Sequence, residues 1–192
     1  MDNSCNKANI ILGLLRRTLS KCSQRTKTLA YQSLVRPHLE YAATAWDPHT
    51  KRETKKLEQV QRRAARFVTN NYSTYQSVTL LLGQLNWQPL EIRRAMMRQT
   101  IMYRILNSSI AIPATYVTFG PPRTRAPHPM KLQHIRVRID IYRYSFFPRT
   151  IIQWNTLPQH IVMSPTIATF KLNIAGYYSS QPRYCYPQYR LD

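Results

Sequence analysis

The sequence predicts a mainly α-helical fold, a helical bundle followed by a small mixed and partly irregular C-terminal unit. Three observations predict it. Apolar residues make up 43% of the 192 residues, which is enough to form a core. Up to about Leu106 they recur every three or four positions, the period of an amphipathic helix. Beyond Leu106 prolines and short alternating runs replace that period. We therefore expect a helical domain at 1–110, a Pro/Arg-rich linker at 111–134, a small unit at 135–175 and a disordered tail at 176–192.

The N-terminal domain is predicted to contain helices at Lys7–Leu19, Thr26–Trp46, Lys51–Val68, Ser77–Leu82 and Pro89–Leu106. Pro37 should bend the second helix, because proline removes a backbone hydrogen bond. Asp47-Pro48 should end it, since the residue before proline avoids helical angles. Gly83 is expected to stop the fourth helix.

The helix at Lys51–Val68 is predicted to have two contrasting faces. Its apolar residues lie within an arc of about 100°, on the helical wheel of 100° per residue. On the opposite side seven basic residues lie within an arc of about 140°, namely Lys51, Arg52, Lys55, Lys56, Arg62, Arg63 and Arg66. Glu53 and Glu58 are its only acidic members, so pairing within the helix cannot neutralise the stripe.

The C-terminal part predicts shorter elements. Ile135–Ile141 alternates apolar and basic residues, as a short strand does. Pro148–Trp154 is predicted to be a short helix. Ser164-Pro165 should provide the N-cap and first position of a last helix that ends near Ile174.

Charge is the strongest feature of the composition. The 28 Lys and Arg residues face only 8 Asp and Glu residues, a formal net charge of +20. Residues 1–70 carry 14 basic and 5 acidic side chains, and residues 71–192 carry 14 and 3, so the excess runs along the whole chain. Such self-repulsion favours a polyanionic partner. Nucleic acid is the expected partner rather than an acidic membrane surface, because no lipid-binding helix stands out.

Other site classes lack the residues they need. Cys5, Cys22 and Cys185 are widely spaced and the five histidines are scattered, so we expect reduced thiols and no metal site. No apolar stretch approaches the roughly 20 residues of a membrane span, and no signal-peptide pattern is present. We therefore expect an intracellular protein, in a nuclear or cytoplasmic ribonucleoprotein.

Catalysis by this chain is not expected. Phosphodiester chemistry normally requires clustered carboxylates that hold divalent metal. The acidic residues form no such cluster, and we expect Glu40 and Asp47 to balance local charge or cap a helix. Four glycines form no phosphate-binding loop, so no cofactor is expected.

Two further basic groups are candidate phosphate contacts. Arg93, Arg94 and Arg98 lie on the helix that follows Pro89, and Arg136 and Arg138 lie on the predicted strand. Arg136, Arg138, Arg143 and Arg149 also alternate with the aromatic residues Tyr142, Tyr144, Phe146 and Phe147, a mixture that can stack bases. For Phe146, Phe147 and Trp154 we favour a role in the core over base stacking.

Several segments taken in order resemble one family. They are LGLLRRTL at Leu12–Leu19, LAYQSLVRPHLEYAATAWDPHT at Leu29–Thr50, KKLEQVQRRAARFV at Lys55–Val68, LNWQPLEIRR at Leu85–Arg94, YSFFPRTIIQWNTLP at Tyr144–Pro158 and the helix around Pro165–Leu172. Together they resemble the region after the catalytic palm in reverse transcriptases of non-LTR retrotransposons, the jockey-like LINE elements. The resemblance covers about residues 9–175.

The resemblance implies a polymerase thumb with a C-terminal extension, in a family of RNA-directed DNA polymerases. The family's thumb packs on the primer–template duplex, and its catalytic aspartates belong to the palm. Nothing here matches the palm's YxDD-type turn, the family's endonuclease or a zinc knuckle. Met1 is therefore expected to be the start of a truncated element or gene model.

Four interpretations stay open. The chain is expected to be a non-catalytic fragment that binds RNA or an RNA–DNA duplex through phosphate contacts. Alternatively it is a protein-interaction module that docks on the missing palm, or a non-functional truncated gene product. An independent nuclease or polymerase would show metal-dependent turnover, which we do not expect.

Overall fold

The protein is mainly α-helical, as the sequence predicts. The computed structural model describes residues 2–107, 109–112, 117–120 and 128–180, and within them it contains helices and a single isolated bridge, with no strands. The chain divides into two compact units, Met1–Ala95 and Met96–Asp192, whereas we expected the helical domain to extend to residue 110. No helix among the described residues is both long and apolar enough to span a membrane.

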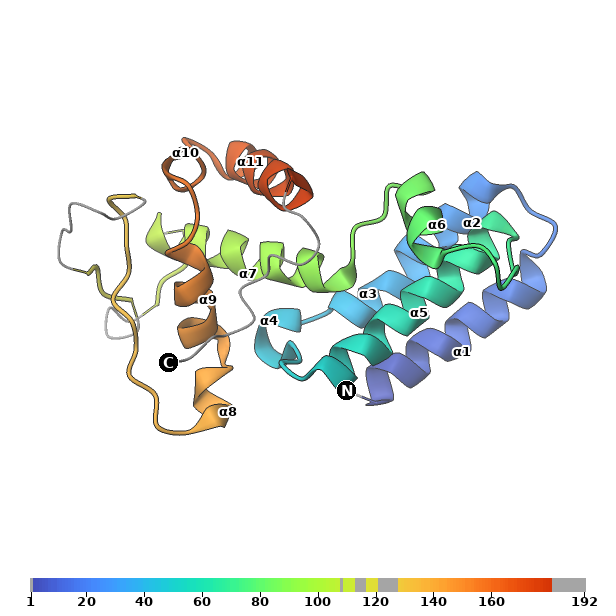
Figure 1. The fold of residues 1–192 in the computed structure, drawn as a ribbon, viewed down its shortest axis with the longest axis horizontal. Helices are drawn as coiled ribbons and strands as arrows, with labels where there is room; N and C mark the ends of the chain where they lie inside the picture. The colour runs from blue at the N-terminus through green and yellow to red at the C-terminus, as the bar shows by residue number, and fades with distance from the viewer. Residues whose placement is uncertain (1, 108, 113–116, 121–127, 181–192) are drawn as a thin grey trace. The chain divides into compact units, whose positions relative to one another are not determined.

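The first unit is built from α1 to α6 and the start of α7 (Figure 1). These elements are α1 (Asp2–Thr18), α2 (Gln24–Ala30), a π-helical turn (Tyr31–Val35), α3 (Arg36–Glu40), α4 (Ala43–Trp46), α5 (Lys51–Thr69), α6 (Val78–Gln84) and α7 (Leu90–Leu106). α1 and α5 lie side by side, and α2, the π turn and α3 pack against them. The first unit is thus a helical bundle around one core.

Apolar side chains from each of these helices form that core. Leu12 of α1, Tyr31 and Leu39 of the α2–α3 segment, and Leu57 and Phe67 of α5 are all at most 2% exposed. Burial of each such large side chain stabilises the fold by about 1.5–3 kcal/mol. Tyr31 also stacks on the ring of Trp87, with centroids 4.3 Å apart. The period-3.6 pattern of the sequence therefore identified the faces that pack.

The predicted second helix is interrupted rather than merely bent. It becomes α2, the π turn, α3 and α4, with a break at Ala42, whose φ is 49°. Pro37 is one of the first two residues of α3. Its ring would clash with the carbonyl four residues earlier in a continuous α-helix, and the wider π turn directly before α3 relieves that clash. The helix does end at Asp47-Pro48, as expected.

Gly83 does not stop the fourth helix, which runs through it to Gln84. The chain reverses instead at Asn86, whose φ is 51°. Asparagine tolerates this left-handed conformation better than most residues, because its short polar side chain can hydrogen-bond locally. The prediction that Gly83 stops the fourth helix is therefore wrong.

The second unit contains the rest of α7 and α8 (Asp140–Arg143), α9 (Phe146–Trp154), α10 (Gln159–Val162) and α11 (Ile167–Ser180). Trp154 is fully buried, as predicted for a core residue, and its indole nitrogen donates to the carbonyl of Met130 at 3.1 Å. Its ring stacks on Phe170 at 6.0 Å. Tyr103 of α7 stacks on the same phenyl ring at 4.4 Å and donates to the carbonyl of Ser164 at 2.7 Å.

Three C-terminal predictions differ from the structure. Residues 135–139 form no strand, because the isolated bridge in this part of the described chain joins Phe119 to Leu132, not to them. Thr166, not Ser164, caps the last helix, and its hydroxyl accepts from the amide of Thr169 at 3.2 Å. α11 continues through the expected tail start at Gly176 to Ser180, because Tyr178 is buried. Residues 181–192 and, within the expected linker, residues 113–116 and 121–127 lie outside the described residues.

Candidate nucleic-acid interface

α5 separates its apolar and basic side chains, as predicted. Its buried face includes Leu57, Val60, Ala64, Phe67 and Val68. On the other face lie the seven basic residues Lys51, Arg52, Lys55, Lys56, Arg62, Arg63 and Arg66, here called the α5 ridge. Lys56 and Arg66 are half-buried and the other five are exposed. The ridge therefore presents its charge mainly to solvent.

The spacing along α5 places these cations above one another. Lys51 and Arg62, Arg52 and Arg63, and Lys55 and Arg66 are each eleven residues apart in the sequence. Eleven residues make about three helical turns, so each pair lies on one line about 16 Å long. Such a row suits the regularly spaced charges of a phosphate backbone.

Caps at both ends fix the helix that carries the ridge. The hydroxyl of Thr50 accepts from the amide of Glu53 at 3.4 Å, at the first turn. At the other end Asn70 adopts a φ of 51°, and its amide donates to the carbonyls of Arg66 and Phe67. An N-cap of this kind stabilises a helix by about 1 kcal/mol. Both ends of the ridge are thereby defined.

Two ridge residues also bind neighbouring segments of the same unit. The guanidinium of Arg63 donates to the side-chain oxygen of Asn9 on α1 at 3.1 Å. That of Arg66 donates to the carbonyl of Ser73, in the loop after α5, at 3.0 Å. The side chains of Lys51, Arg52, Lys55 and Arg62 make no hydrogen bond or ion pair within the described part of the chain. An external anion can therefore approach them.

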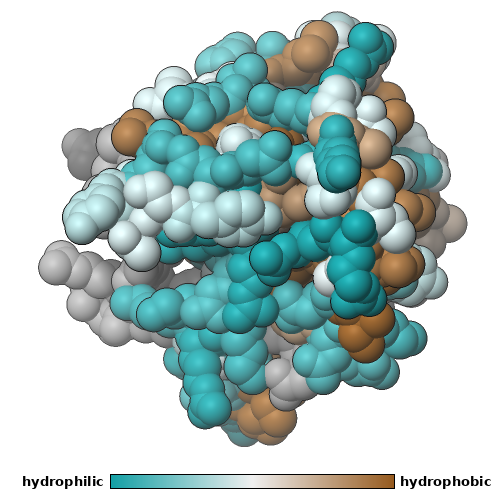
Figure 2. Space-filling view, turned by 90° about the vertical axis from the view of Figure 1, so that its right-hand side faces the viewer, coloured by the Kyte–Doolittle hydropathy of each residue, from teal (hydrophilic) through white to brown (hydrophobic). Residues whose placement is uncertain are grey.

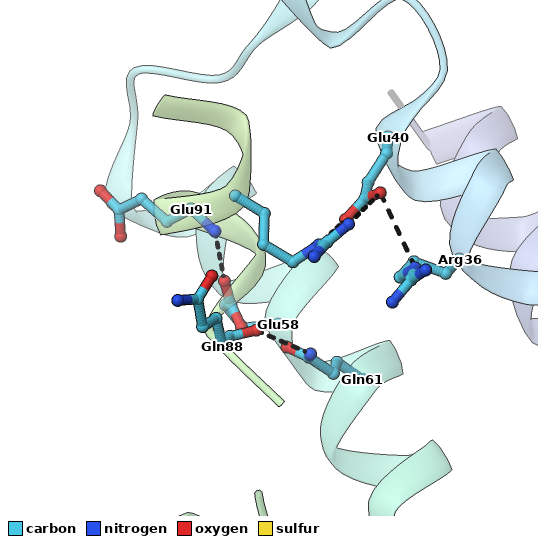
Figure 3. Close-up of polar contacts among 7 residues, drawn as sticks. Arg36, Glu40, Glu58, Gln61, Gln88 and Glu91 are labelled. Atoms are coloured by element: carbon cyan, nitrogen blue, oxygen red, sulfur yellow. Dashed lines mark hydrogen bonds and ion pairs between the residues drawn. The ribbon is translucent and has the colours of Figure 1, made fainter. Parts of the chain in front are cut away.

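The acidic residues of α5 do not neutralise the ridge. Glu58 points from α5 toward the start of α7, where its carboxylate accepts from the amide of Glu91 at 2.9 Å (Figure 3). Burial raises the pKa of this carboxyl above its usual range, against the lowering effect of that hydrogen bond. Beside it Gln61 donates to the carbonyl of Gln88 at 3.0 Å. Glu53 is half-buried in the first turn of α5, where a negative charge favours the helix dipole.

Three predicted phosphate contacts, Arg93, Arg94 and Arg98, are instead structural. Arg94 is fully buried and donates to Asp47 at 2.7 Å, and Arg98, 2% exposed, donates to Gln153 at 3.0 Å. The predicted phosphate contacts at Arg94 and Arg98 are wrong, because α7 buries these polar side chains as well as its apolar ones.

Arg93 is committed to a carboxylate. Both ends of its guanidinium donate to Glu40, which also pairs with Arg36 at 3.8 Å (Figure 3). The expected roles of Glu40 and Asp47 in balancing charge are thereby confirmed.

Some basic residues of the second unit are exposed, and others are buried or paired. Arg136 and Arg138 are exposed on the irregular segment before α8 and stay candidate phosphate contacts. Arg149 is buried, and Arg143 pairs with Asp140 at 3.3 Å. Phe146 and Phe147 are half-buried and contact each other edge to face. The predicted mixture of arginines and aromatic rings is therefore only partly exposed.

A group at the end of α5 was not predicted from the sequence. Arg16 of α1 lies over the ring of Tyr72, 5.5 Å from its centroid. Tyr72 is 51% exposed and Tyr75 is 100% exposed. A signal was present, because two tyrosines in a polar loop directly after a basic helix are an unusual composition for a plain turn. Figure 2 looks onto this end of the first unit, where hydrophilic side chains cover most of the face.

The described residues contain no group of three or more His, Cys, Asp and Glu side chains that could hold a metal ion. An open pocket of about 490 Å³ lies between α2, the π turn and α6, lined by Gln24, Arg25, Thr28, Leu29, Gln32, Gln84 and Leu85. Arg25 is the only ionisable side chain in that lining, so the pocket offers no acid–base pair.

No protein-family model, curated protein or solved structure matches this chain.

Proposed function

We propose that this chain binds nucleic acid through the α5 ridge, by contacts to phosphates and with little base recognition. One observation carries the proposal: seven cations share one face of a 19-residue helix that holds only two acidic residues. Arg and Lys contacts to phosphate give affinity without reading sequence. RNA or an RNA–DNA duplex is the ligand that the resemblance of residues 9–175 to a retrotransposon polymerase thumb implies.

In this proposal the chain is a non-catalytic part of an RNA-directed DNA polymerase. Its role is to hold the nucleic acid while another domain supplies the metal-binding carboxylates. The bundle of α1, α2, α3 and α5 supports a thumb-like role, because it holds the ridge on a rigid helix rather than on a loop. Arg136 and Arg138 would add phosphate contacts from the second unit.

Charge reversal tests the proposal. The variant Arg62→Glu/Arg63→Glu/Arg66→Glu should abolish binding of labelled RNA in a filter-binding assay. The matched control Lys21→Glu/Arg25→Glu/Lys171→Glu changes the net charge by the same amount at exposed positions outside α5 and should still bind. Equal losses in both variants would show that net charge alone, not the ridge, holds the RNA. Circular dichroism checks that each variant remains helical.

A second candidate is a docking module for the polymerase palm. Ile10 and Leu14 favour it, because they lie one turn apart on α1 and are 71% and 50% exposed. Ile10→Asp/Leu14→Asp should prevent docking to a separately produced palm and spare RNA binding. The ridge variant should do the opposite. Loss of RNA binding in the α1 variant would count against an assignment of RNA binding to α5.

A further inference from the structure

The loop after α5 carries aromatic side chains at the end of a row of cations. Residues 70–77 connect α5 to α6, and Tyr75 within them is 100% exposed. Single exposed apolar groups are ordinary on protein surfaces. Here two tyrosines three residues apart share one loop, and arginines from both α1 and α5 contact that loop. This arrangement differs from an isolated exposed ring.

The loop is held in place by its own polar groups. The amide of Ser73 donates to the side chain of Asn71 at 3.1 Å, and the amide of Tyr75 donates to the hydroxyl of Ser73 at 3.3 Å. The side chains of Asn71 and Gln76 are hydrogen-bonded to each other. These bonds close the loop locally and leave the Tyr75 ring in solvent. Because these bonds order the loop backbone, little further backbone freedom is lost when the ring binds.

Arginines join the two tyrosines to the α5 ridge. Arg66, the last ridge residue, donates to the carbonyl of Ser73, midway between the tyrosines. Arg16 lies over one face of Tyr72, 5.5 Å from the ring centroid. Figure 1 shows this loop close to the C-terminal end of α1. A strand whose phosphates follow the ridge would therefore arrive at Tyr72 and Tyr75.

We propose that Tyr72 and Tyr75 stack on unpaired bases, so that this surface prefers single-stranded nucleic acid to a duplex. The inference rests on the proposed function of the α5 ridge. Surfaces that bind single strands without sequence preference combine a row of cations with aromatic rings on which bases stack. A duplex keeps its bases paired and offers such a ring only its terminal pair. Tyr75, with both faces in solvent, is the principal stacking residue, and Tyr72 assists on the face that Arg16 leaves open.

The test uses the full chain, a 12-nucleotide oligouridine and a 12-base-pair RNA duplex as probes in fluorescence anisotropy. Tyr75→Ala should weaken oligouridine binding by about tenfold or more, the range measured for loss of one stacked base. Tyr75→Trp should restore it, and duplex binding should change less than about twofold. Tyr41→Ala removes another tyrosine that is 81% exposed and serves as the matched control.

The outcomes separate this inference from the proposed function. If Tyr75→Ala binds oligouridine as wild type does while Arg62→Glu/Arg63→Glu/Arg66→Glu fails to bind, stacking is overturned and the phosphate contacts stand. If the ridge variant also binds as wild type does, both proposals fail. An abasic 12-mer should bind wild type no better than oligouridine binds Tyr75→Ala. Tight binding of the abasic strand would overturn stacking directly.

Discussion

The guanidinium of Arg94 donates to the carboxylate of Asp47 at 2.7 Å, and the two side chains are only 0% and 6% exposed. Asp47 lies just before Pro48 and the N-cap of α5, so the pair joins the start of α5 to the start of α7. A buried guanidinium that loses its carboxylate is an uncompensated charge in a low-dielectric interior. The pair therefore fixes the position from which the α5 ridge begins.

Removal of one partner should destabilise the first unit. We expect Asp47→Ala to lower the free energy of unfolding by about 3–5 kcal/mol, as for other broken buried pairs. Urea denaturation followed by circular dichroism measures the change. The control is Asp140→Ala, which breaks an exposed pair with Arg143 and should cost less than about 1 kcal/mol. Equal effects of the two substitutions would contradict the structural role of Asp47.

Glu58 should give the protein a characteristic dependence of stability on pH. Burial raises the pKa of its carboxyl, which outweighs the hydrogen bond from the Glu91 amide and the positive charges of Arg94 and Arg62. The folded state therefore holds this proton more tightly than the unfolded state. The resulting stabilisation is complete below the unfolded pKa of about 4.3 and is lost as the pH rises through the raised folded value.

The variant Glu58→Gln removes this titration while it keeps an oxygen that can accept from the Glu91 amide. Between the unfolded and the folded pKa of Glu58, the stability of the variant relative to wild type should rise with pH. Above the folded pKa this difference should stay constant. Urea denaturation of both proteins at a series of pH values measures the difference. A difference that does not vary with pH would show that Glu58 is not desolvated in the folded state.

Lys27 is fully buried, and its amino group donates to the Asn70 side chain at 2.7 Å and lies 5.2 Å from the centroid of the Phe67 ring. Its long stem fills space between α2 and α5. Lys27→Met keeps most of that volume and should cost less than about 1.5 kcal/mol. Lys27→Ala leaves a cavity and should cost about 2–5 kcal/mol. If thermal melts show equal losses, the ammonium rather than the stem stabilises this contact.

Asn155 of the second unit is 6% exposed. It hydrogen-bonds the backbone of Leu132 as a neighbouring strand would. Its side chain accepts from the amide of Leu132 and donates to the carbonyl of the same residue, both at 2.9 Å. Asn155→Ala should leave both backbone groups unsatisfied, at a cost of about 1–3 kcal/mol for each group. Hydrogen exchange at the Leu132 amide should become faster, whereas exposed Thr156→Ala should leave it unchanged. Unchanged exchange in Asn155→Ala would contradict this role.

The sequence predicted the helices with long amphipathic patterns and failed where tertiary partners decide the structure. α5 was expected to end at Val68 and ends at Thr69, since its apolar arc and its Thr50 cap are local features. The strand expected at Ile135–Ile141 does not form. The alternating pattern of this segment correctly predicted that Arg136 and Arg138 are exposed. No local pattern, however, shows whether a second strand is present to pair with the segment.

The candidate site shows the same division. All seven ridge residues lie on the predicted face, because one helix alone determines that face. Arg94 and Arg98 were misplaced because their burial depends on Asp47 and Gln153, which are about fifty residues away in the sequence. Tyr75 was missed because its exposure depends on hydrogen bonds inside a loop, which no hydrophobic period describes.

The dependence of binding on salt tests the central claim, that the α5 ridge neutralises phosphates, most directly. If about six phosphates are neutralised, the logarithm of the affinity for duplex DNA should fall with the logarithm of salt concentration with a slope of about −5. The neutralising variant Arg62→Gln/Arg63→Gln/Arg66→Gln should bind more weakly, with a slope shallower by about 3. A flat response of the wild-type chain, or the same steep slope in both proteins, would contradict the claim.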